Sequence, residues 1–422
     1  MREGNFMIIY GAGNELKWYL ENCPSLIEHI KYIIDSDKRK TGKSFFGISI
    51  MPENILDNLE DNNIIIVSSK MYFESISNTV KKHNPNLRCV YIAEVASKFS
   101  KSKFCDYEGN IYYTNAEHER SSMWEYKDEY ILRDEKFFER YMSLIKNLDE
   151  DSVDTINQIL IRLEKLFYSS CNHLDIFTEF EKKKIMEIRT ELHDKIFEIK
   201  KNVYAYKNYI LPCNYYNIGT YSDKYGIDKL ECLSKIKNGN ILDLGAFVGD
   251  SALMFSKITS GEVYAVEAQK KNCEIIREVI ALNNANNIKI FQSAVGDKEG
   301  SATFYYNETS NWGTFCPLES REYSQEEITV TTVDAIVEKN NLKISVIKAD
   351  IEGMESDMIR GAVNTLKEQK PTLLLKIHHT PRDFFEIKPF IESLKLGYKF
   401  KIHKQVDGNI LIGTLLIAEV CE

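Results

Sequence analysis

Residues 240–251 combine carboxylates and glycines in a spacing that could bind a ligand. The stretch reads Asn-Ile-Leu-Asp-Leu-Gly-Ala-Phe-Val-Gly-Asp-Ser, and its apolar start predicts a buried strand. Gly245 and Gly249 let the backbone come close to a ligand, while Asp243 keeps a negative charge where the strand ends. The two polar residues that close the stretch can cap a helix. The pattern therefore predicts a strand, a ligand-binding turn and a helix.

A further carboxylate, Glu267, ends the apolar run that starts at Val263. An acid at this point of a doubly wound sheet accepts hydrogen bonds from a ribose. A dinucleotide turn has the pattern G-x-G-x-x-G, which admits a pyrophosphate at a helix N-terminus, whereas this turn carries Asp243. An anionic turn suits a cationic ligand such as S-adenosylmethionine. An ordinary strand-turn-helix connection is the alternative.

Three carboxylates, Asp350, Glu352 and Glu355, follow the apolar run that begins at Ile347. At the carboxyl end of a central strand they would face the ligand crevice. Asp350 or Glu352 could be a general base toward an acceptor hydroxyl, a ligand for a hard divalent cation, or a hydrogen-bond acceptor for a sugar. A helix N-terminus stabilised by acidic side chains is the alternative that needs no ligand.

Two histidines end the next apolar run, at residues 370–379. Imidazole titrates near neutral pH, so His379 or His378 could relay a proton. A single histidine is more often structural, but two at a strand end, in the same crevice as Asp350, favour a catalytic role.

The elements that must position these residues alternate between strand and helix from Gly239 onward, which predicts a mostly parallel sheet covered by helices. Ser293 and Ala294 follow the third strand, where an adenine would lie. Residues 301–306 and 328–332 are expected to be additional strands, and residues 307–322 between them a substrate-binding loop. The chain is expected to finish with an antiparallel strand pair.

The first hundred residues repeat this alternation, with a turn at Gly11 and Gly13 and a strand that ends at Asp35. Asp35 lies about 20 residues beyond the turn, where an acid reaches a ribose in dinucleotide folds. The third glycine of that fingerprint is replaced by Leu16. The stretch resembles the small Rossmann-like modules that accompany sugar-modifying enzymes of bacterial glycan pathways. It is expected either to bind a nucleotide or nucleotide-sugar through Gly11, Gly13 and Asp35, or to serve packing and protein contact.

Residues 116–201 contain neither glycine nor proline, and their apolar residues recur at helical spacing. One such series runs from Phe177 to Ile199 and predicts about six helical turns. These helices are expected to form a connector that packs on the two α/β domains, with a homodimer interface or a substrate lid as alternatives. The tyrosine-rich residues 212–225 could cover the cofactor pocket.

The length of 422 residues predicts two or three domains. The net charge of -9 argues against a non-specific nucleic-acid binder. Nine cysteines without a C-x-x-C pair predict reduced thiols in a cytoplasmic protein. The chain has no basic region followed by an apolar stretch at its start and no apolar run near the ~20 residues of a bilayer span, so we expect it to be neither exported nor membrane-spanning.

Six motifs occur in order over residues 215–420: Asp243–Ser251, Val266-Glu267-Ala268, Ala294-Val-Gly296, Thr332-Val-Asp334, Asp350–Glu355 and His379-x-Pro-x-Asp383. Together they resemble the FkbM family of S-adenosylmethionine-dependent methyltransferases. The resemblance implies a seven-stranded class I methyltransferase fold, O-methylation of a sugar or natural product, and cofactor binding by Asp243, Gly245, Gly249 and Glu267. Phe247 stands where the family commonly has asparagine, and Ala335 where a second aspartate is frequent.

We therefore predict an α/β protein with a Rossmann-like domain at residues 1–105, a helical connector at 106–205 and a methyltransferase domain at 206–422. The predicted catalytic residues are Asp350, Glu352 and His379. The cofactor is predicted to be S-adenosylmethionine, bound by Asp243, Gly245, Ala246, Gly249, Ser251, Glu267, Ala268, Ser293 and Ala294. No metal site is predicted, although a divalent cation stays possible. The acceptor is expected to be a hydroxyl-bearing sugar, glycan or small molecule; an inactive nucleotide or nucleotide-sugar binding protein is the alternative.

Overall fold

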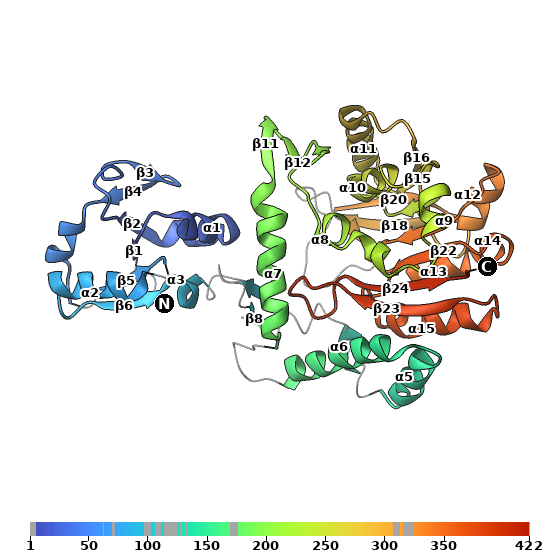
Figure 1. The fold of residues 1–422 in the computed structure, drawn as a ribbon, viewed down its shortest axis with the longest axis horizontal. Helices are drawn as coiled ribbons and strands as arrows, with labels where there is room; N and C mark the ends of the chain where they lie inside the picture. The colour runs from blue at the N-terminus through green and yellow to red at the C-terminus, as the bar shows by residue number, and fades with distance from the viewer. Residues whose placement is uncertain are drawn as a thin grey trace. The chain divides into compact units, whose positions relative to one another are not determined.

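The structure is a computed structural model that describes residues 6–61, 63–69, 72–96, 103–105, 111–113, 125–126, 129–130, 134–168, 176–306, 313–314 and 324–421. The chain forms two compact units (Figure 1). The first contains Met1–Arg120 and Leu166–Lys183, and the second Ser121–Lys165 and Lys184–Glu422. The expected three-part division at residues 105 and 205 stays a prediction.

The first unit contains a sheet in the order β3-β4-β2-β1-β5-β6. All neighbouring strands of this sheet are parallel except β3 and β4. The strands are β1 (Met7–Tyr10), β2 (Ile30–Ile34), β3 (Ser44–Phe45), β4 (Ile48–Met51), β5 (Ile64–Val67) and β6 (Arg88–Tyr91). These bounds confirm an N-terminal α/β unit, while its Rossmann-like character stays a prediction.

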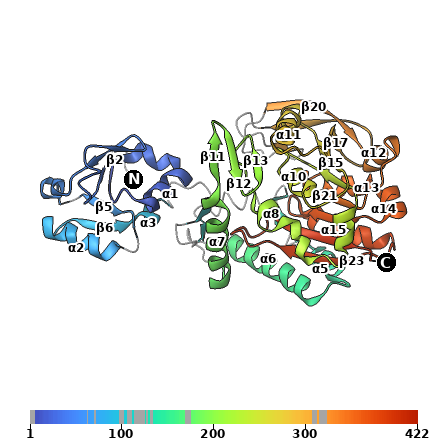
Figure 2. The ribbon, with the colours of Figure 1, turned by 45° about the horizontal axis from the view of Figure 1, so that its top comes forward.

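Helices cover both faces of this first sheet. Leu16 and Tyr19 of α1 (Asn14–Asn22) and Ile92 of α3 (Ile92–Ala96) share one core with Ile9. Val80 of α2 (Phe73–His83) belongs to the core on the other face. Figures 1 and 2 show α1 and α2 on different sides of the sheet. Both faces are apolar because successive strand residues point in opposite directions.

The second unit is built on a seven-stranded sheet in the order β16-β15-β14-β21-β22-β24-β23. The first five strands are parallel, and β24 runs antiparallel to both β22 and β23. The expected α/β fold and its final antiparallel pair are thereby confirmed. The strands are β14 (Ile241–Leu244), β15 (Val263–Glu267), β16 (Ile288–Gln292), β21 (Val346–Ala349), β22 (Thr372–Lys376), β23 (Lys399–Lys404) and β24 (Thr414–Glu419).

Every residue of β14, β21 and β22 is buried, so both faces of the sheet centre are covered. One large apolar core joins one face to α8 (Ile218–Tyr221), α9 (Leu233–Asn238), α10 (Asp250–Ser256) and α11 (Lys270–Asn283). Four more helices of this unit lie later in the chain. They are α12 (Val333–Lys339), α13 (Glu355–Arg360), α14 (Val363–Gln369) and α15 (Pro381–Ser393).

A smaller sheet in the order β17-β20-β18-β19 contains the two additional strands that the sequence predicts. Its core is formed by Ala294, Phe304, Ile328 and Val330. The strands are β17 (Ala294–Val295), β18 (Gly300–Tyr306), β19 (Gly313–Thr314) and β20 (Ser324–Thr331). Of the expected loop at 307–322, only residues 313–314 are among those described.

The helical region contains α5 (Phe137–Ile145), α6 (Glu150–Tyr168) and α7 (Glu179–Glu191). Within the second unit, α5 packs on α15, with the rings of Phe137 and Phe385 6.0 Å apart, and the Ser152 hydroxyl of α6 accepts a hydrogen bond from the Ile402 backbone N–H at 2.9 Å. Short strands also occur in residues 103–130: β7 (Lys103–Cys105), β8 (Ile111–Tyr113), β9 (Glu125–Tyr126) and β10 (Glu129–Tyr130).

The expectation of a helix that continues to Ile199 is wrong, because α7 ends at Glu191. Residues beyond it form three antiparallel strands, in which Ile199 is exposed. Asn202 has a φ of 61°, which allows the tight turn between the first two strands. The backbone of these residues thus forms hydrogen bonds between strands instead of within a helix, although their apolar residues recur at helical spacing. The strands are β11 (Phe197–Lys200), β12 (Val203–Tyr206) and β13 (Tyr209–Leu211).

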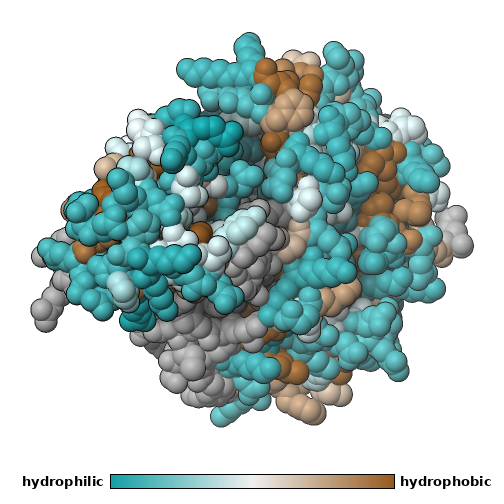
Figure 3. Space-filling model, turned by 60° about the vertical axis from the view of Figure 1, so that its left-hand side comes forward, coloured by the Kyte–Doolittle hydropathy of each residue, from teal (hydrophilic) through white to brown (hydrophobic). Residues whose placement is uncertain are grey.

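The face in Figure 3 is mostly hydrophilic, with apolar side chains in small separate groups. None of the helices that the structure describes combines the length and apolar character that crossing a bilayer requires. The expectation that all cysteines are reduced is wrong for Cys232 and Cys421, which form a disulfide with a Cα–Cα distance of 5.9 Å. The tertiary structure brings together two thiols that are 189 residues apart in sequence.

Candidate functional site

The turn after β14 lies against the loop after β21. Gly245 has a φ of 71°, and a Cβ atom there would lie 1.9 Å from the carbonyl oxygen of Asp350. Gly249 also has a positive φ, 84°, and faces Ile276 of α11. Only glycine fits such a close approach of two backbones without a shift. The predicted glycines therefore bring the β14 turn next to the Asp350 cluster.

Asp243 is fully buried beneath this turn and does not line the cavity described below. Its two carboxylate oxygens lie 2.8 Å from Lys348 Nζ and 2.7 Å from the Ser251 hydroxyl. Lys348 Nζ also donates to the carbonyl oxygen of Gly245 at 2.8 Å. Burial by itself lowers the pKa of Lys348, but the facing carboxylates of Asp243 and Asp350 raise it above its ordinary value. This ion pair fixes β21 to the β14 turn.

Glu267 ends β15 and is fixed by backbone donors. One oxygen accepts a hydrogen bond from Phe247 N at 2.8 Å, and the other accepts one from Gln269 N at 2.9 Å. Asn272, on the first turn of α11, adds a longer hydrogen bond of 3.3 Å. Burial raises the pKa of Glu267, although these donors oppose the effect. The carboxylate thus has a defined orientation at the cavity wall.

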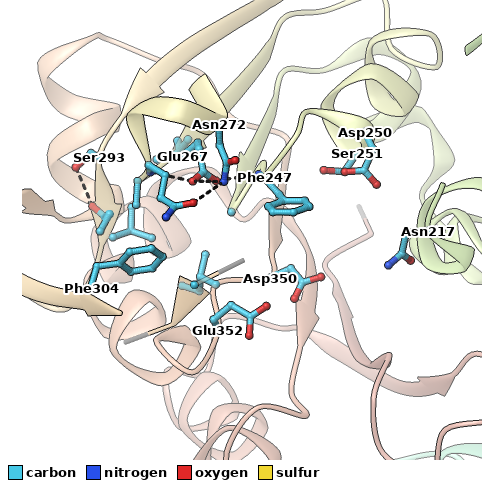
Figure 4. A pocket seen from close by; sticks show the side chains of 18 of the residues that line it. Asn217, Phe247, Asp250, Ser251, Glu267, Asn272, Ser293, Phe304, Asp350 and Glu352 are labelled. Atoms are coloured by element: carbon cyan, nitrogen blue, oxygen red, sulfur yellow. Dashed lines mark hydrogen bonds between the residues drawn. The ribbon is translucent and has the colours of Figure 1, made fainter. Parts of the chain in front are cut away.

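A cavity of about 410 Å³ lies at the carboxyl ends of these strands, within the second unit. Figure 4 shows Glu267 and Asn272 on one side and Asp350 and Glu352 on the facing side. The predicted site residues that line the cavity are Gly245, Ser251, Glu267, Ala268, Ser293, Ala294, Asp350 and Glu352. Four others do not line it: Asp243, Ala246, Gly249 and His379.

The wall carries an unusual charge. Four carboxylates line the cavity, from Asp250, Glu267, Asp350 and Glu352, and none of the described lining residues is a lysine, arginine or histidine. Asp250 is buried and accepts a hydrogen bond from the Thr220 hydroxyl at 2.8 Å. Burial raises the pKa of Asp250 to about 6. At neutral pH the cavity therefore favours a cationic ligand over an anionic one.

Several lining residues were not predicted as site residues. Tyr215, Asn217 and Tyr225 belong to the tyrosine-rich segment that was expected to cover the pocket, and they line it. The ring of Phe247 lies 5.0 Å from that of Tyr215. The others are Asp250, Val266, Gln269, Asn272, Val295, Phe304, Gly313 and Ile351. Gln269 and Asn272 have a sequence signal, because they follow Glu267 by two and five residues, whereas Phe304 is brought in by the smaller sheet.

His379 lies behind Asp350 and Glu352, with Nε2 3.4 Å from Asp350 Oδ1 and 3.6 Å from Glu352 Oε2. Its Nδ1 lies 2.9 Å from Oε1 of the fully buried Glu355. Although burial by itself lowers the pKa of His379, the carboxylates of Glu355 and Glu352 raise it to about 10. The structure thus brings together the three predicted catalytic residues, two of them at the cavity.

The turn in the first unit has a different environment. Gly11 has a φ of 105°, and Asp35 accepts a hydrogen bond from Ala12 N at 2.8 Å. The same oxygen of Asp35 is 2.9 Å from Lys40 Nζ, and its other oxygen accepts a hydrogen bond from Asp37 N. Gly13 begins α1 without strain, at a φ of -108°. The carboxylate proposed for a ribose is thus occupied by neighbouring groups of the chain.

Comparison with known proteins assigns the class of this second unit. The sequence at residues 243–400 matches the family model described as the methyltransferase FkbM domain. The matched residues include the end of β14, all of β21 and β22, and the cavity carboxylates. The second unit therefore contains a stretch that matches a methyltransferase domain. In particular, residues 243–400 form a methyltransferase FkbM domain, as the resemblance of the motifs implies.

Solved structures give weaker likenesses. A crystal structure of methyltransferase FkbM from Methylobacillus flagellatus is 16% identical, covers 98% of this chain and 90% of its own, and has a TM-score of 0.45. The Methanococcus jannaschii fibrillarin pre-rRNA processing protein is 16% identical over 54% of this chain and 96% of its own, with a TM-score of 0.32. Precorrin-6y C5,15-methyltransferase from Geobacter metallireducens is 14% identical over 47% and 87%, with a TM-score of 0.29. Among curated proteins, none matches the chain.

Proposed function

We propose that the second unit transfers a methyl group from S-adenosylmethionine to a hydroxyl of a sugar, glycan or related small molecule. The observation that carries the proposal is the cavity wall, which has four carboxylates and no basic side chain among its described residues. S-adenosylmethionine has a positively charged sulfur and an ammonium group, so this wall attracts it. A dinucleotide or nucleotide-sugar would bring phosphates next to the carboxylates, which repel them.

The lining residues divide the cavity by chemistry. Glu267, oriented by Phe247 N and Gln269 N, is placed to accept hydrogen bonds from ribose hydroxyls. Phe304 and Ala294 offer an apolar surface for adenine at the smaller sheet. Asp250 lies near the β14 turn and would pair with the ammonium group. Asp243 is then a positioning residue, because it acts on the turn through Lys348 and Ser251.

Asp350 and Glu352 are the candidate bases, since both line the cavity opposite Glu267. When bound, the cofactor supplies a methyl group on a positively charged sulfur. An acceptor hydroxyl held beside Asp350 would form its oxygen–carbon bond while the sulfur–carbon bond breaks, and the hydroxyl proton would pass to a carboxylate. His379 does not line the cavity and would orient these carboxylates from behind.

Calorimetric titration of the whole chain with S-adenosylmethionine, NAD and UDP-glucose tests the cofactor assignment. We expect one S-adenosylmethionine site and no response to the two anionic ligands. Asp350→Asn should keep this affinity, because the aspartate faces the acceptor side, but lose about 10²–10⁴-fold in methyl transfer from labelled cofactor to sugar hydroxyls. Binding of NAD or UDP-glucose without binding of S-adenosylmethionine would overturn the proposal.

A further inference from the structure

At the cavity wall, three side chains could hold a metal ion: one lines the cavity, and the other two come from consecutive residues. Ligand atoms of Asp350, His378 and His379 all lie within 4.8 Å of one another. From this cluster we propose that Asp350, His378 and His379 form a binding site for a divalent transition-metal ion beside the acceptor. Two imidazole nitrogens and one carboxylate oxygen are a ligand set that transition metals use, and three protein ligands leave open positions.

The distances suit one ion. Ligand atoms about 2.1 Å from an ion lie roughly 3 Å apart when adjacent and about 4 Å apart when opposite. His379 Nε2 and Asp350 Oδ1 are 3.4 Å apart, which is near the adjacent arrangement. The whole set lies within 4.8 Å, so its widest pair exceeds the opposite arrangement by at most about 0.8 Å, which a side-chain rotation can close.

The backbone explains how consecutive histidines come to the same side. Successive residues of a strand point in opposite directions. However, β22 ends at Lys376, and α15 begins with Thr380 as its N-cap. In the short link between them the imidazole rings of His378 and His379 lie 4.1 Å apart at an interplanar angle of 37°. Because the chain has left the strand here, the two neighbouring imidazole rings can lie side by side, tilted to one another.

A second observation supports a ligand role for His379. Metal-binding histidines usually donate their other ring N–H to a carboxylate, which fixes the ring and the tautomer. Here Nδ1 of His379 is 2.9 Å from Oε1 of the buried Glu355. Glu355 is itself fixed by hydrogen bonds from Ile351 N at 2.7 Å and Gly353 N at 3.0 Å. Nε2 of His379 is therefore directed toward Asp350.

The catalytic consequence rests on the proposed function. An ion held here would bind the acceptor hydroxyl at an open position and lower its pKa. The hydroxyl proton would pass to Glu352, which lines the cavity and has one oxygen 3.6 Å from His379 Nε2. The resulting alkoxide oxygen would take the methyl group, while the electron pair of the broken bond returns to the cofactor sulfur. Acceptors with two neighbouring hydroxyls, as in sugars, could chelate such an ion.

Titration of the chelator-treated whole chain with Co²⁺, followed by visible absorption, tests the site. We expect one equivalent to bind with the spectrum of nitrogen and oxygen ligation. His378→Gln and Asp350→Asn should weaken Co²⁺ binding at least about tenfold. His403→Gln is the matched control, because His403 pairs with Asp223 at 2.7 Å elsewhere in the same unit. This control should bind Co²⁺ like the unaltered chain.

Two results would overturn the metal site. One is the absence of Co²⁺ binding in the unaltered chain. The other is Co²⁺ binding by His378→Gln and Asp350→Asn that is as tight as binding by the unaltered chain. A thiolate absorption band would also overturn it, because Asp350, His378 and His379 offer only nitrogen and oxygen ligands. Calorimetry with S-adenosylmethionine on the metal-free chain separates this failure from a failure of the proposed methyl transfer.

Discussion

The turns at Gly11 and Gly245 share one plan, with a buried parallel strand, a glycine at positive φ, a helix, and an acid at the end of the next strand. In both, that acid accepts a hydrogen bond at 2.8 Å from a backbone N–H of the turn, Ala12 N for Asp35 and Phe247 N for Glu267. Their surroundings differ. Lys40 covers Asp35, whereas Glu267 forms part of a cavity wall.

The difference shows that a turn motif does not define a site by itself. In the second unit a lysine is also present, but Lys348 lies beneath the turn and pairs with Asp243, which leaves the acid on β15 available to a ligand. In the first unit Lys40 comes from the loop after β2 and reaches the acid directly. The two turns thus differ in where a lysine lies: Lys40 pairs with the acid that could bind a ligand, whereas the buried Lys348 pairs with a different acid, Asp243.

The largest expected effect separates the glycines of the two turns. Gly245→Ala would place a Cβ 1.9 Å from the Asp350 carbonyl at a φ of 71°, so we expect the second unit to lose about 3 kcal/mol or more of unfolding free energy. Gly13→Ala has nothing within 4 Å of its Cβ and should change stability by at most about 0.5 kcal/mol. Urea unfolding curves measure both. Equal midpoints for the two variants would contradict this account of the turn.

The next effect compares the two acids. Glu267→Gln places an amide NH₂ against one of two backbone donors and removes the charge, so S-adenosylmethionine affinity should fall by about 1.5–3 kcal/mol, or roughly 10–150-fold. Asp35→Asn should leave this affinity within about twofold, a spread below 0.5 kcal/mol. Calorimetry provides the measurement.

Glu262→Gln is a second control for Glu267, because it changes a half-exposed carboxylate just before the same strand. If all three variants bind S-adenosylmethionine alike, the cofactor site is not at Glu267. Asp243→Ala is a poorer test, since it leaves Lys348 charged and unpaired in a buried position. Such a loss costs about 3–5 kcal/mol and would affect folding before binding.

The third effect concerns the first residue of each helix, Asp250 in α10 and Asn14 in α1. Because burial raises the pKa of Asp250 to about 6 from an ordinary 3.8, its ionised form destabilises the fold fully above about pH 6, and this penalty declines as the pH falls from 6 toward 3.8. A rise in pKa from 3.8 to about 6 corresponds to a loss of at most ~3 kcal/mol of unfolding free energy. Replacing the carboxylate removes this loss but also weakens the hydrogen bond from Thr220, so the net gain is smaller. Asp250→Asn should therefore stabilise the chain by roughly 1–2 kcal/mol at pH 8.

Thermal unfolding of Asp250→Asn and the unaltered chain at pH 5 and pH 8 measures this difference. We expect the gain to be smaller at pH 5, since Asp250 is then largely protonated in the folded state. Calorimetry of the same variant at pH 8 should show weaker binding of S-adenosylmethionine. A gain that does not change with pH would contradict the assignment of the titration to Asp250.

The smallest effect is expected at Lys40. Lys40→Met removes the 2.9 Å ion pair with Asp35 but leaves the backbone donors Ala12 N and Asp37 N, so the loss should be about 1 kcal/mol. If the lysine alone prevents ligand binding at the first turn, the variant should gain a thermal shift with nucleosides. We expect no such shift, because the donors of the turn still occupy both oxygens of Asp35.

Much of the second unit could be predicted from local pattern. The apolar runs at β14, β15, β21 and β22 stand between turn residues, and their parallel alignment follows from the alternation with helices. Since the carboxyl ends of parallel strands meet at one edge, Glu267 and Asp350 had to lie in the same crevice. Both line the cavity for this reason.

Predictions that relied on spacing alone were less secure. The apolar series to Ile199 fits a helix, but the Asn202 turn and the strand ladder compete for the same backbone groups and prevail beyond Glu191. Asp243 has the position of a cofactor-binding acid in the motif, yet its carboxylate faces Lys348 from the neighbouring strand. Lys348 is 105 residues away in the sequence, and it becomes the neighbour of Asp243 only through the register of β14 against β21 in the sheet. This pairing could not be predicted from the motif.

By itself, the sequence determined the order of strands and helices in the second unit, the two glycine turns and the acids that follow them, because these depend on local apolar periodicity and backbone freedom. Only the tertiary structure decided which acid is covered by a lysine, which aromatic side chains close the cavity, and that His378 and His379 turn to the same side as Asp350. Those outcomes depend on contacts between segments far apart in the chain, and their energies come from burial and charge pairing that no single segment contains.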